Sequence, residues 1–317
     1  MRIDLITHKY SIVPKNQTLS SLNTHEISKR LNKDGLVLAV GPFTFCIKSS
    51  LPSIVNNVQK IYADFQLLSH DDLIDFYVSI KKTKGIRRFI KPQINFYSDD
   101  YSPFLPLPAS QAFPLLEWGM NWCIAQHAHH YLLLHSAVLE KNGKSVILPA
   151  QSGSGKSTLC ALLALNGWRL LSDEMALIDL KSCQLHALAR PISLKNESIK
   201  VISAQSHNTV FGEIVDDTNK GTISHLKPST VSVEYVAEPV RPFAIIFPKY
   251  QVNQAINVQE TDKATAFMSV IENSFNYAVL AEAGFNTVAA LIDQVQCHTL
   301  TYSSTEEVLA FFEEFAH

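Results

Sequence analysis

The sequence predicts an α/β protein with two domains, and three observations support this fold class. Before residue 100, several short stretches alternate apolar and polar residues as strands do, and others have helical spacing. Pro103, Pro106 and Pro108 interrupt this pattern, so we place a domain boundary there, between residues 1–108 and 109–317. Beyond the boundary, apolar runs alternate with helical patterns around a glycine-containing loop. A smaller mixed α+β domain is therefore expected to precede a larger α/β domain.

The smaller domain is expected to combine two helices with an antiparallel sheet. In chain order, the predicted elements are a helix over Leu22–Leu31, two strands within Gly35–Ser50 that turn at Gly41-Pro42, a helix over Leu51–Phe65, and strands over Ile74–Ile80 and Gln93–Tyr97. Pro52 suits the first turn of the second helix, because a helix start needs no hydrogen bond from that N–H. The segment Lys81–Lys91 is basic and is predicted to be a turn.

The larger domain is expected to begin with a long helix and to continue as strands and helices. The predicted elements are a helix over Ala109–His129, strands over Tyr131–Leu139 and Ser145–Pro149, a helix over Ser157–Asn166, strands over Arg169–Ser172, Met175–Leu180, Val231–Val236 and Pro242–Phe247, and helices over Lys263–Ala283 and Glu306–Phe315. Asn142-Gly143 favours a two-residue hairpin between the first two strands. Gly167 suits the position that ends a helix.

Charge and cysteine use exclude several classes of protein. Lysine and arginine total 27 against 29 aspartates and glutamates, so the 317-residue chain has a net charge of −2 and no overall basic field for nucleic acid. The five cysteines are widely spaced without a CxxC pair, which predicts neither a disulfide framework nor a zinc site. With no signal peptide and no apolar run of about 18 residues, we expect a cytoplasmic protein that does not enter a membrane.

The segment AQSGSGKST, Ala150–Thr158, carries the strongest local signal. It matches the phosphate-binding pattern G-x-x-x-x-G-K-[ST], except that Ala150 replaces the first glycine, at a strand exit where φ need not be positive. Glycines let successive N–H groups curl around a phosphate, and the helix start adds a positive dipole end. An apolar strand precedes the loop and an apolar helix follows it. We predict nucleotide contacts from Gln151, Ser152, Gly153, Ser154, Gly155, Lys156, Ser157 and Thr158.

Phosphoryl transfer also needs a carboxylate for the metal and a group that accepts the proton of the attacking hydroxyl. His135 lies in an otherwise apolar predicted strand before the loop, and Asp173-Glu174 follows an apolar run after it. Each has a simpler interpretation, because His135 suits a buried core histidine and Asp173 suits a solvated turn. From these residues alone, both interpretations stay open.

The order of these motifs resembles the catalytic domain of the HPr kinase/phosphorylase family. His135, the loop Ala150–Ser157, the stretch Asn166–Leu170 and the pair Asp173-Glu174 follow one another as the family's motifs do. The similarity is closer to the subgroup named HprK-related kinase A and extends over roughly residues 35–315. The stretches that carry it are Val40–Phe45, Leu116–His129, Leu171–Ile178, Arg190–Asn196, Lys220–Pro228 and Asn273–Tyr277.

The resemblance implies a P-loop kinase domain of the HPr kinase C-terminal type that uses ATP and Mg²⁺. It implies transfer of the γ-phosphate to a hydroxyl, foremost a serine on a small protein or peptide, and a homo-oligomeric protein. Asp173 would orient or deprotonate the acceptor hydroxyl, and His135 would bond Asp173 or contact phosphate. Lys156 would contact the phosphates, and Ser157, Glu174 and Asp173 would hold the metal ion.

Two departures from the family leave the acceptor open. The segment after Arg190 does not reproduce the family's L-E-x-R-G signature, and residues 1–108 do not resemble its regulatory domain, so the resemblance does not carry over HPr as the acceptor. Two alternatives therefore remain, a small-molecule kinase acting on serine or a sugar-like hydroxyl and a nucleotide-binding module without transfer chemistry. Weaker candidates for holding phosphate or an acidic acceptor, with solvated surface charge as the alternative, are Arg190, Lys195, Lys220 and Lys227.

Overall fold

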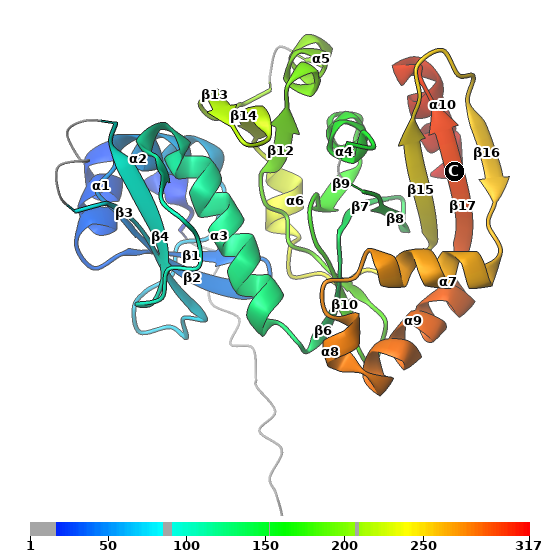
Figure 1. Cartoon of the computed structure of the whole chain (residues 1–317), viewed down its shortest axis with the longest axis horizontal. Coiled ribbons are helices and arrows are strands. Elements are labelled where there is room, and N and C mark those ends of the chain that lie inside the picture. Colours follow the sequence, from blue (N-terminus) through cyan, green and yellow to red (C-terminus); the bar gives the residue numbers. More distant parts are fainter. Residues whose placement is uncertain (1–16, 85–90, 152, 207–208) are drawn as a thin grey trace, which may run out of the picture.

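The computed structural model describes residues 17–84, 91–151, 153–206 and 209–317. Figure 1 shows two bodies side by side, with the N-terminal body on the left and the larger body on the right. Several sheets and helices make the chain a mixed α/β protein, which confirms the predicted class. Ser152 and residues 85–90 of the predicted basic turn lie outside the described residues.

The N-terminal body contains a five-stranded sheet in the order β1-β2-β3-β4-β5. Its elements are η1 (Leu19–Ser21), α1 (Thr24–Asn32), β1 (Leu36–Val40), β2 (Phe43–Ser49), α2 (Pro52–Ile61), β3 (Phe76–Lys82), β4 (Gln93–Ser98) and β5 (Leu107–Pro108). Both predicted helices are confirmed, and Pro52 begins α2. The predicted antiparallel pairing is wrong for β2 and β3, which are parallel. The reason is that α2 connects them as a crossover, which parallel strands require.

Helix α3 (Ala112–His127), preceded by the 3-10 turn η3 (Ala109–Gln111), packs on the five-stranded sheet. Phe113 and Leu116 of α3 are buried in one cluster with Phe96 of β4. The sequence assigned this helix to the larger domain, whereas its apolar side chains cover the N-terminal sheet. Helix α3 therefore lies between the two bodies (Figure 1), and the boundary at residue 108 stays a prediction.

A six-stranded sheet in the order β16-β17-β15-β8-β7-β9 forms the centre of the larger body. Its elements are β7 (Ser136–Lys141), β8 (Lys144–Pro149), β9 (Arg169–Ser172), β15 (Ala244–Tyr250), β16 (Asn257–Glu260) and β17 (Gln296–Tyr302), with α4 (Lys156–Leu165) and α10 (Thr305–Phe315) packed in the same core. β15 is parallel to β8 and β17, and β7 is antiparallel to β8 and β9. Asn142 and Gly143 both have positive φ, which confirms the predicted hairpin.

Two three-stranded sheets, β11-β10-β6 and β12-β14-β13, flank the central sheet. The remaining elements are β6 (Tyr131–Leu134), β10 (Ala176–Asp179), β11 (Leu185–His186), β12 (Ile192–Lys195), α5 (Glu197–Gln205), β13 (Val215–Thr218), β14 (Gly221–Leu226), α6 (Thr230–Glu234), α7 (Lys263–Glu272), α8 (Tyr277–Leu280) and α9 (Glu282–Gln294). Helices α7, α8 and α9 lie below the sheet in the view of Figure 1.

Two predicted strands take another form. The apolar run Tyr131–Leu139 divides at His135 into β6 and β7, which belong to different sheets. The predicted strand Val231–Val236 is largely helix α6, because the side chain of Ser229 accepts the N–H of Ser232 and so caps a helix start. Alternating apolar residues alone do not distinguish a short strand from a capped helical turn.

The predicted helix Lys263–Ala283 is also wrong in its extent. α7 ends at Glu272, and a polar turn follows in which Asn273 bonds back to the backbone oxygen of Ser269. Asn276 in this turn accepts the N–H of Leu133, so it ties the turn to β6. Strand β17 was not predicted from the sequence, although it lies within the central sheet.

All five cysteines are buried and free, which agrees with their wide spacing and the absence of a CxxC pair. Within the described ranges, no helix combines the length and the apolar character that crossing a lipid bilayer requires.

Candidate active site

The glycine loop connects β8 to helix α4. Gly153 and Gly155 have φ values of +90° and +89°, in the left-handed region that glycine adopts without strain. A Cβ on Gly155 would lie 3.0 Å from the Cβ of Tyr250, whereas open space surrounds that position on Gly153. Ala150 lies outside the positive-φ region, so alanine fits at the first glycine position as predicted. The loop therefore has the local geometry expected from its sequence.

Lys156 begins α4, and its side chain points toward the end of β9. The residue is 6% exposed, and its Nζ donates to the backbone oxygen of Asp173 at 3.0 Å. A buried ammonium beside the N-terminus of a helix attracts anions through both its charge and the helix dipole. This arrangement suits a phosphate group.

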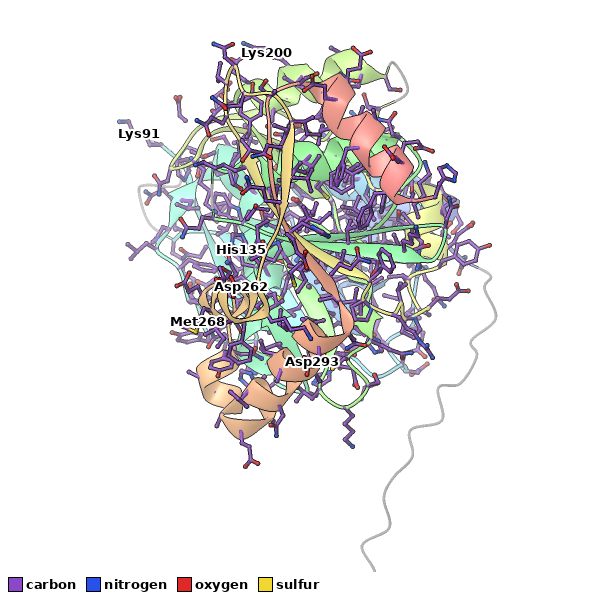
Figure 2. All side chains as sticks on the ribbon, turned by 90° about the vertical axis from the view of Figure 1, so that its right-hand side faces the viewer. Lys91, His135, Lys200, Asp262, Met268 and Asp293 are labelled. Atoms are coloured by element: carbon purple, nitrogen blue, oxygen red, sulfur yellow. The ribbon has the colours of Figure 1, made fainter. Side chains whose placement is uncertain are left out.

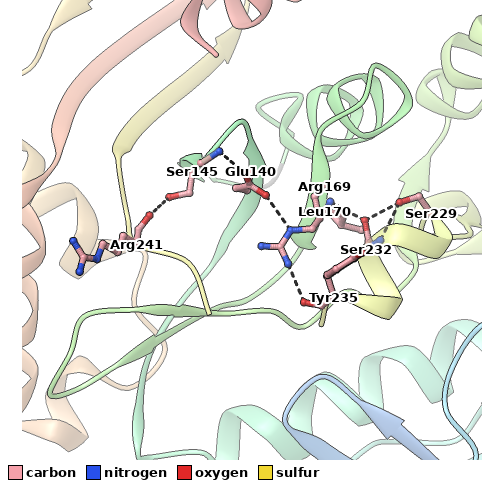
Figure 3. Close-up of polar contacts among 9 residues, drawn as sticks. Glu140, Ser145, Arg169, Leu170, Ser229, Ser232, Tyr235 and Arg241 are labelled. Carbon is pink, nitrogen blue, oxygen red and sulfur yellow. Dashed lines mark hydrogen bonds and ion pairs between the residues drawn. The ribbon is translucent and has the colours of Figure 1, made fainter. Parts of the chain in front are cut away.

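Strand β9 is anchored at its start by Arg169. The Nε of Arg169 lies 3.0 Å from the carboxylate of Glu140 on β7, and its Nη1 donates to the backbone oxygen of Tyr235 (Figure 3). Both charged side chains are largely buried. Asp173 follows β9 directly, and its backbone oxygen accepts from the Nζ of Lys156 at the start of α4.

Asp173 is buried at the end of β9, with 3% of the residue exposed. Its Oδ2 accepts the backbone N–H of Ser193 at 3.1 Å, while its Oδ1 has no hydrogen-bond partner among the described residues. Burial raises the pKa of Asp173 to about 6, the charge of Glu174 adds to this increase, and Lys156 opposes it. A carboxylate that titrates close to neutral pH is suited to accept a proton during catalysis. The interpretation of Asp173 as a solvated turn residue is therefore wrong.

Glu174 has a different environment, because its carboxylate lies 3.3 Å from Nε2 of His135. Burial raises the pKa of Glu174, but the hydrogen bond from His135 and the charges of Lys156 and Lys195 outweigh burial and lower it to about 2. The two neighbouring acids therefore differ, since Asp173 holds a proton more readily and Glu174 stays ionised. The expected contact of His135 with Asp173 is replaced by its contact with Glu174.

Strand register explains this pairing. β6 and β10 are antiparallel, and Leu134 at the end of β6 lies opposite Ala176 at the start of β10. His135 directly follows β6 and Glu174 shortly precedes β10, so the two residues lie at the same edge of this strand pair. The backbone N–H of His135 donates to the oxygen of Asn273, and its ring lies 5.8 Å from that of Phe275. The imidazole is partly exposed, so His135 is not the buried core histidine of the simpler interpretation.

Ser157 and the two carboxylates provide oxygen atoms that fit Mg²⁺. The Ser157 hydroxyl helps to lower the pKa of Asp173, which indicates that the two side chains interact. In the described part of the chain, no three His, Cys, Asp or Glu side chains gather as a metal site. Mg²⁺ usually takes one or two carboxylates and completes its shell with phosphate and water oxygens. Of the two carboxylates, Glu174 stays ionised, which suits a metal ligand.

The basic candidates lie in different places. Lys195 is close enough to lower the pKa of Glu174, and the Nζ of Lys220 lies 5.3 Å from the ring centre of Trp118 beside the site. Lys227 instead forms an ion pair with Asp64 of the N-terminal body at 2.8 Å. The predicted contact of Lys227 with phosphate or an acidic acceptor stays a prediction.

Arg190 is buried and held by α3. Its Nη2 lies 2.6 Å from the carboxylate of Glu117, and its Nη1 donates to Asn121. The hydroxyl of Tyr62 donates to the same carboxylate at 2.6 Å. Burial lowers the pKa of Arg190, but the charge of Glu117 outweighs burial and raises it. The interpretation of Arg190 as solvated surface charge is therefore wrong.

A pocket beside Asp173 lies between α3, β9 and β12. Its lining includes Trp118, Arg190, Ser193 and His225. Ser193 and His225 are opposite each other in the β12–β14 register, which brings both side chains to one place. Ser193 and Trp118 could not be recognised from the sequence, because neither residue type nor spacing marks them. Glu117, by contrast, is a lone acid in an apolar helix, and a buried charge of that kind indicates a partner.

A family model matches part of the chain. Residues 117–199 are similar to the family model described as SynChlorMet cassette protein ScmC. The matched segment runs from α3 into α5 and includes the glycine loop, His135 and Asp173. A search of curated proteins finds no match to the chain.

Proposed function

We propose that this protein is a P-loop kinase that uses ATP and Mg²⁺ to phosphorylate a hydroxyl group. One observation carries the proposal: buried Lys156 at the start of α4 donates to the backbone oxygen of Asp173 at 3.0 Å, and its charge acts on the pKa of the Asp173 carboxylate. The resemblance to the HPr kinase/phosphorylase family supports the same function, because its motifs occur here in the same order.

Nucleotide binding would use the loop between Gln151 and Lys156. Its backbone N–H groups and the start of α4 would face the phosphates, with Lys156 on the β- and γ-phosphate oxygens. Lys156 now bonds the backbone oxygen of Asp173, so phosphate oxygens would replace a contact that already exists. Mg²⁺ supplies positive charge that offsets the charge of the transferring phosphate, with Ser157 and the neighbouring carboxylates as its protein ligands.

Asp173 would act as the general base. The acceptor hydroxyl donates to Oδ1 of Asp173, and its oxygen forms a bond to the γ-phosphorus while the bond to the β–γ bridging oxygen breaks. The products are a phosphorylated acceptor and ADP, and the proton passes to Asp173. The charge of Glu174 raises the pKa of Asp173 and so favours this proton transfer. His135 is a positioning residue, because it holds Glu174.

Exposed apolar side chains near His135 support a serine on a protein or peptide as the acceptor. Phe275, whose ring faces His135, is 49% exposed. Met268 on α7 is also exposed (Figure 2), as are Val279 and Phe285 on the adjoining helices. Apolar surface beside a polar site is typical of polypeptide binding. A small-molecule acceptor is the second candidate, because the pocket beside Asp173 is small and most of its lining residues are polar or charged.

The test compares Lys156→Met and Asp173→Asn with wild type, using an ATP analogue for binding and labelled ATP for transfer. Lys156→Met is expected to weaken nucleotide binding by at least tenfold, because it removes a buried positive charge. Asp173→Asn is expected to keep nucleotide binding and to lose transfer by about 10²- to 10⁴-fold. The exposed Asp293→Asn, on α9 (Figure 2), is the control and should change neither.

The transfer assay offers two sets of phosphate acceptors, a panel of peptides and a panel of metabolites. Transfer to metabolites alone would replace the polypeptide acceptor by a small molecule. Tight nucleotide binding with no transfer and no hydrolysis would contradict the kinase and favour a binding module. Wild-type turnover in Asp173→Asn would remove Asp173 from the reaction.

A further inference from the structure

An exposed tyrosine lies beside the glycine loop, at the end of β15. The backbone N–H of Tyr250 donates to the backbone oxygen of Ser154 at 3.1 Å, and a Cβ on Gly155 would lie 3.0 Å from the Cβ of Tyr250. Tyr250 is 49% exposed, although most residues of β15 are buried. Its ring can therefore offer an aromatic surface to a molecule held in the loop.

The order of the strands places Tyr250 and Asp173 on opposite sides of the glycine loop. The loop follows β8, which pairs with β15 along one edge and with β7 along the other, and β9 lies beyond β7. β15 is parallel to β8, and β9 runs in the same direction because both β8 and β9 are antiparallel to β7. Tyr250 ends β15 and Asp173 follows β9, so both lie at the sheet edge where α/β proteins bind ligands.

This arrangement gives a bound nucleotide a direction. Transfer of the γ-phosphate requires that phosphate near Asp173, whose backbone oxygen already accepts from Lys156. The phosphate chain would then cross the loop, and its nucleoside end would point away from β9 and toward β15. The exposed ring of Tyr250 lies on that side of the loop.

Two contacts with β17 hold Tyr250 in place. Tyr302 lies opposite Tyr250 in the parallel register, and the two ring centres are 5.7 Å apart at an interplanar angle of 75°. Tyr302 is buried in the core that contains α4, and its backbone oxygen accepts the N–H of Gln251. A ring that is already ordered loses little conformational entropy when a ligand binds to it.

We propose that Tyr250 is the nucleobase contact of this protein and that the base stacks on its ring. Stacking accepts every base, and it favours purines over pyrimidines because a purine covers more aromatic surface. The ligand class is therefore a purine nucleoside triphosphate. This base contact rests on the proposed function, because it needs a nucleotide in the loop, but it does not require phosphate transfer.

The experiment measures binding to the full chain by calorimetry in the presence of Mg²⁺. The probes are non-hydrolysable analogues of ATP and UTP, and inorganic triphosphate, which carries the phosphates without a base. Wild type is expected to bind the ATP analogue more tightly than the UTP analogue. Tyr250→Ala should weaken binding of the ATP analogue by about tenfold, because stacking on an aromatic side chain contributes on this scale. The affinity for triphosphate should stay unchanged.

Two further variants are the controls. Tyr250→Phe keeps the ring and removes only the hydroxyl, so it should bind the ATP analogue as wild type does. Tyr77 on β3 is also a half-exposed tyrosine in a strand, with 47% exposed, but it belongs to the N-terminal body. Tyr77→Ala should change the affinity for none of the probes. Unchanged binding of triphosphate to Tyr250→Ala shows that this variant keeps a folded loop.

The outcomes separate the base contact from the proposed function. If phosphate is transferred but Tyr250→Ala binds the ATP analogue as wild type does, the base contact is wrong and the kinase stands. Equal losses of affinity for the analogue and for triphosphate would make Tyr250 a support of the loop and would also overturn the base contact. Equal affinity of wild type for the ATP and UTP analogues would overturn the purine preference.

The kinase can fail while the base contact stands. This is the result if the ATP analogue binds with the expected dependence on Tyr250 but no acceptor is phosphorylated. If neither the ATP analogue nor triphosphate binds to wild type, the base contact and the kinase are both wrong.

Discussion

At the scale of single residues, the site depends on two adjacent acids in unlike surroundings. Asp173 is buried and lines the pocket, and the carboxylate of Glu174 lies 3.3 Å from Nε2 of His135. Because ionised Glu174 disfavours a second negative charge nearby, the pKa of Asp173 is the higher of the two. A pair of neighbouring acids can thus supply both a proton acceptor and a lasting negative charge.

The buried carboxylate of Asp173 should destabilise the fold at neutral and higher pH. Its ordinary pKa is 3.8 and its pKa in the folded chain is about 6. Below pH 3.8 the carboxyl group of Asp173 is protonated in both the folded and the unfolded chain, so it does not reduce the free energy of unfolding. Between pH 3.8 and 6 the unfolded chain releases its proton first, so stability falls as pH rises, by up to about 3 kcal/mol above pH 6.

We therefore expect Asp173→Asn to stabilise the protein, although the proposed function expects the same change to impair transfer. Asparagine is neutral and its side-chain oxygen can still accept the N–H of Ser193. Urea unfolding should show a gain that is larger at pH 8 than at pH 5. A gain independent of pH, or a loss at pH 8, would contradict the raised pKa.

In wild type, kcat/KM should rise as pH increases through about 6, where Asp173 becomes ionised.

At the scale of elements, the glycine loop offers a comparison between two residues with nearly equal φ. An alanine at either position is strained by about 1–2 kcal/mol, because its Cβ disfavours the left-handed region. Only Gly155 also approaches Tyr250 closely. We expect Gly155→Ala to lower the melting temperature and nucleotide affinity more than Gly153→Ala, as measured by thermal unfolding and analogue titration.

Gly143 in the β7–β8 hairpin is the control for this comparison. It has a φ of +79° and open space around it, so Gly143→Ala should cause strain without touching the loop. A drop in melting temperature with unchanged nucleotide affinity is expected there. Equal loss of affinity in all three variants would show that general destabilisation, rather than loop geometry, is responsible.

At the scale of the whole molecule, a buried ion pair joins the two bodies. Glu117 lies on α3, which covers the N-terminal sheet, and Arg190 lies just before β12 of the larger body. Removing one partner leaves a buried charge unpaired, which costs about 3–5 kcal/mol, whereas replacing both with apolar residues restores much of that loss.

Glu117→Leu, Arg190→Met and the double variant form a cycle that tests this connection. Each single variant should unfold at markedly lower urea concentration, and the double variant should be more stable than either single one. Strictly additive losses would contradict a direct pairing across the two bodies.

Local elements were predictable because their causes are local. Asn142-Gly143 specifies a tight turn, and the glycine loop with its flanking strand and helix follows from backbone preference and apolar periodicity. Predictions were wrong where competing local signals are similar in strength, as at α6, where the cap formed by Ser229 outweighs an alternating pattern. The role of the chain as a kinase stays a prediction.

By itself the sequence determined the α/β class, the turn at Asn142, the course of the glycine loop and the acids that follow β9. Only the tertiary structure decided that His135 meets Glu174 and that Ser193 and His225 face one pocket. It also decided that Glu117 meets Arg190, 73 positions later. These contacts depend on strand register and on packing between distant segments, whose energies no local pattern contains.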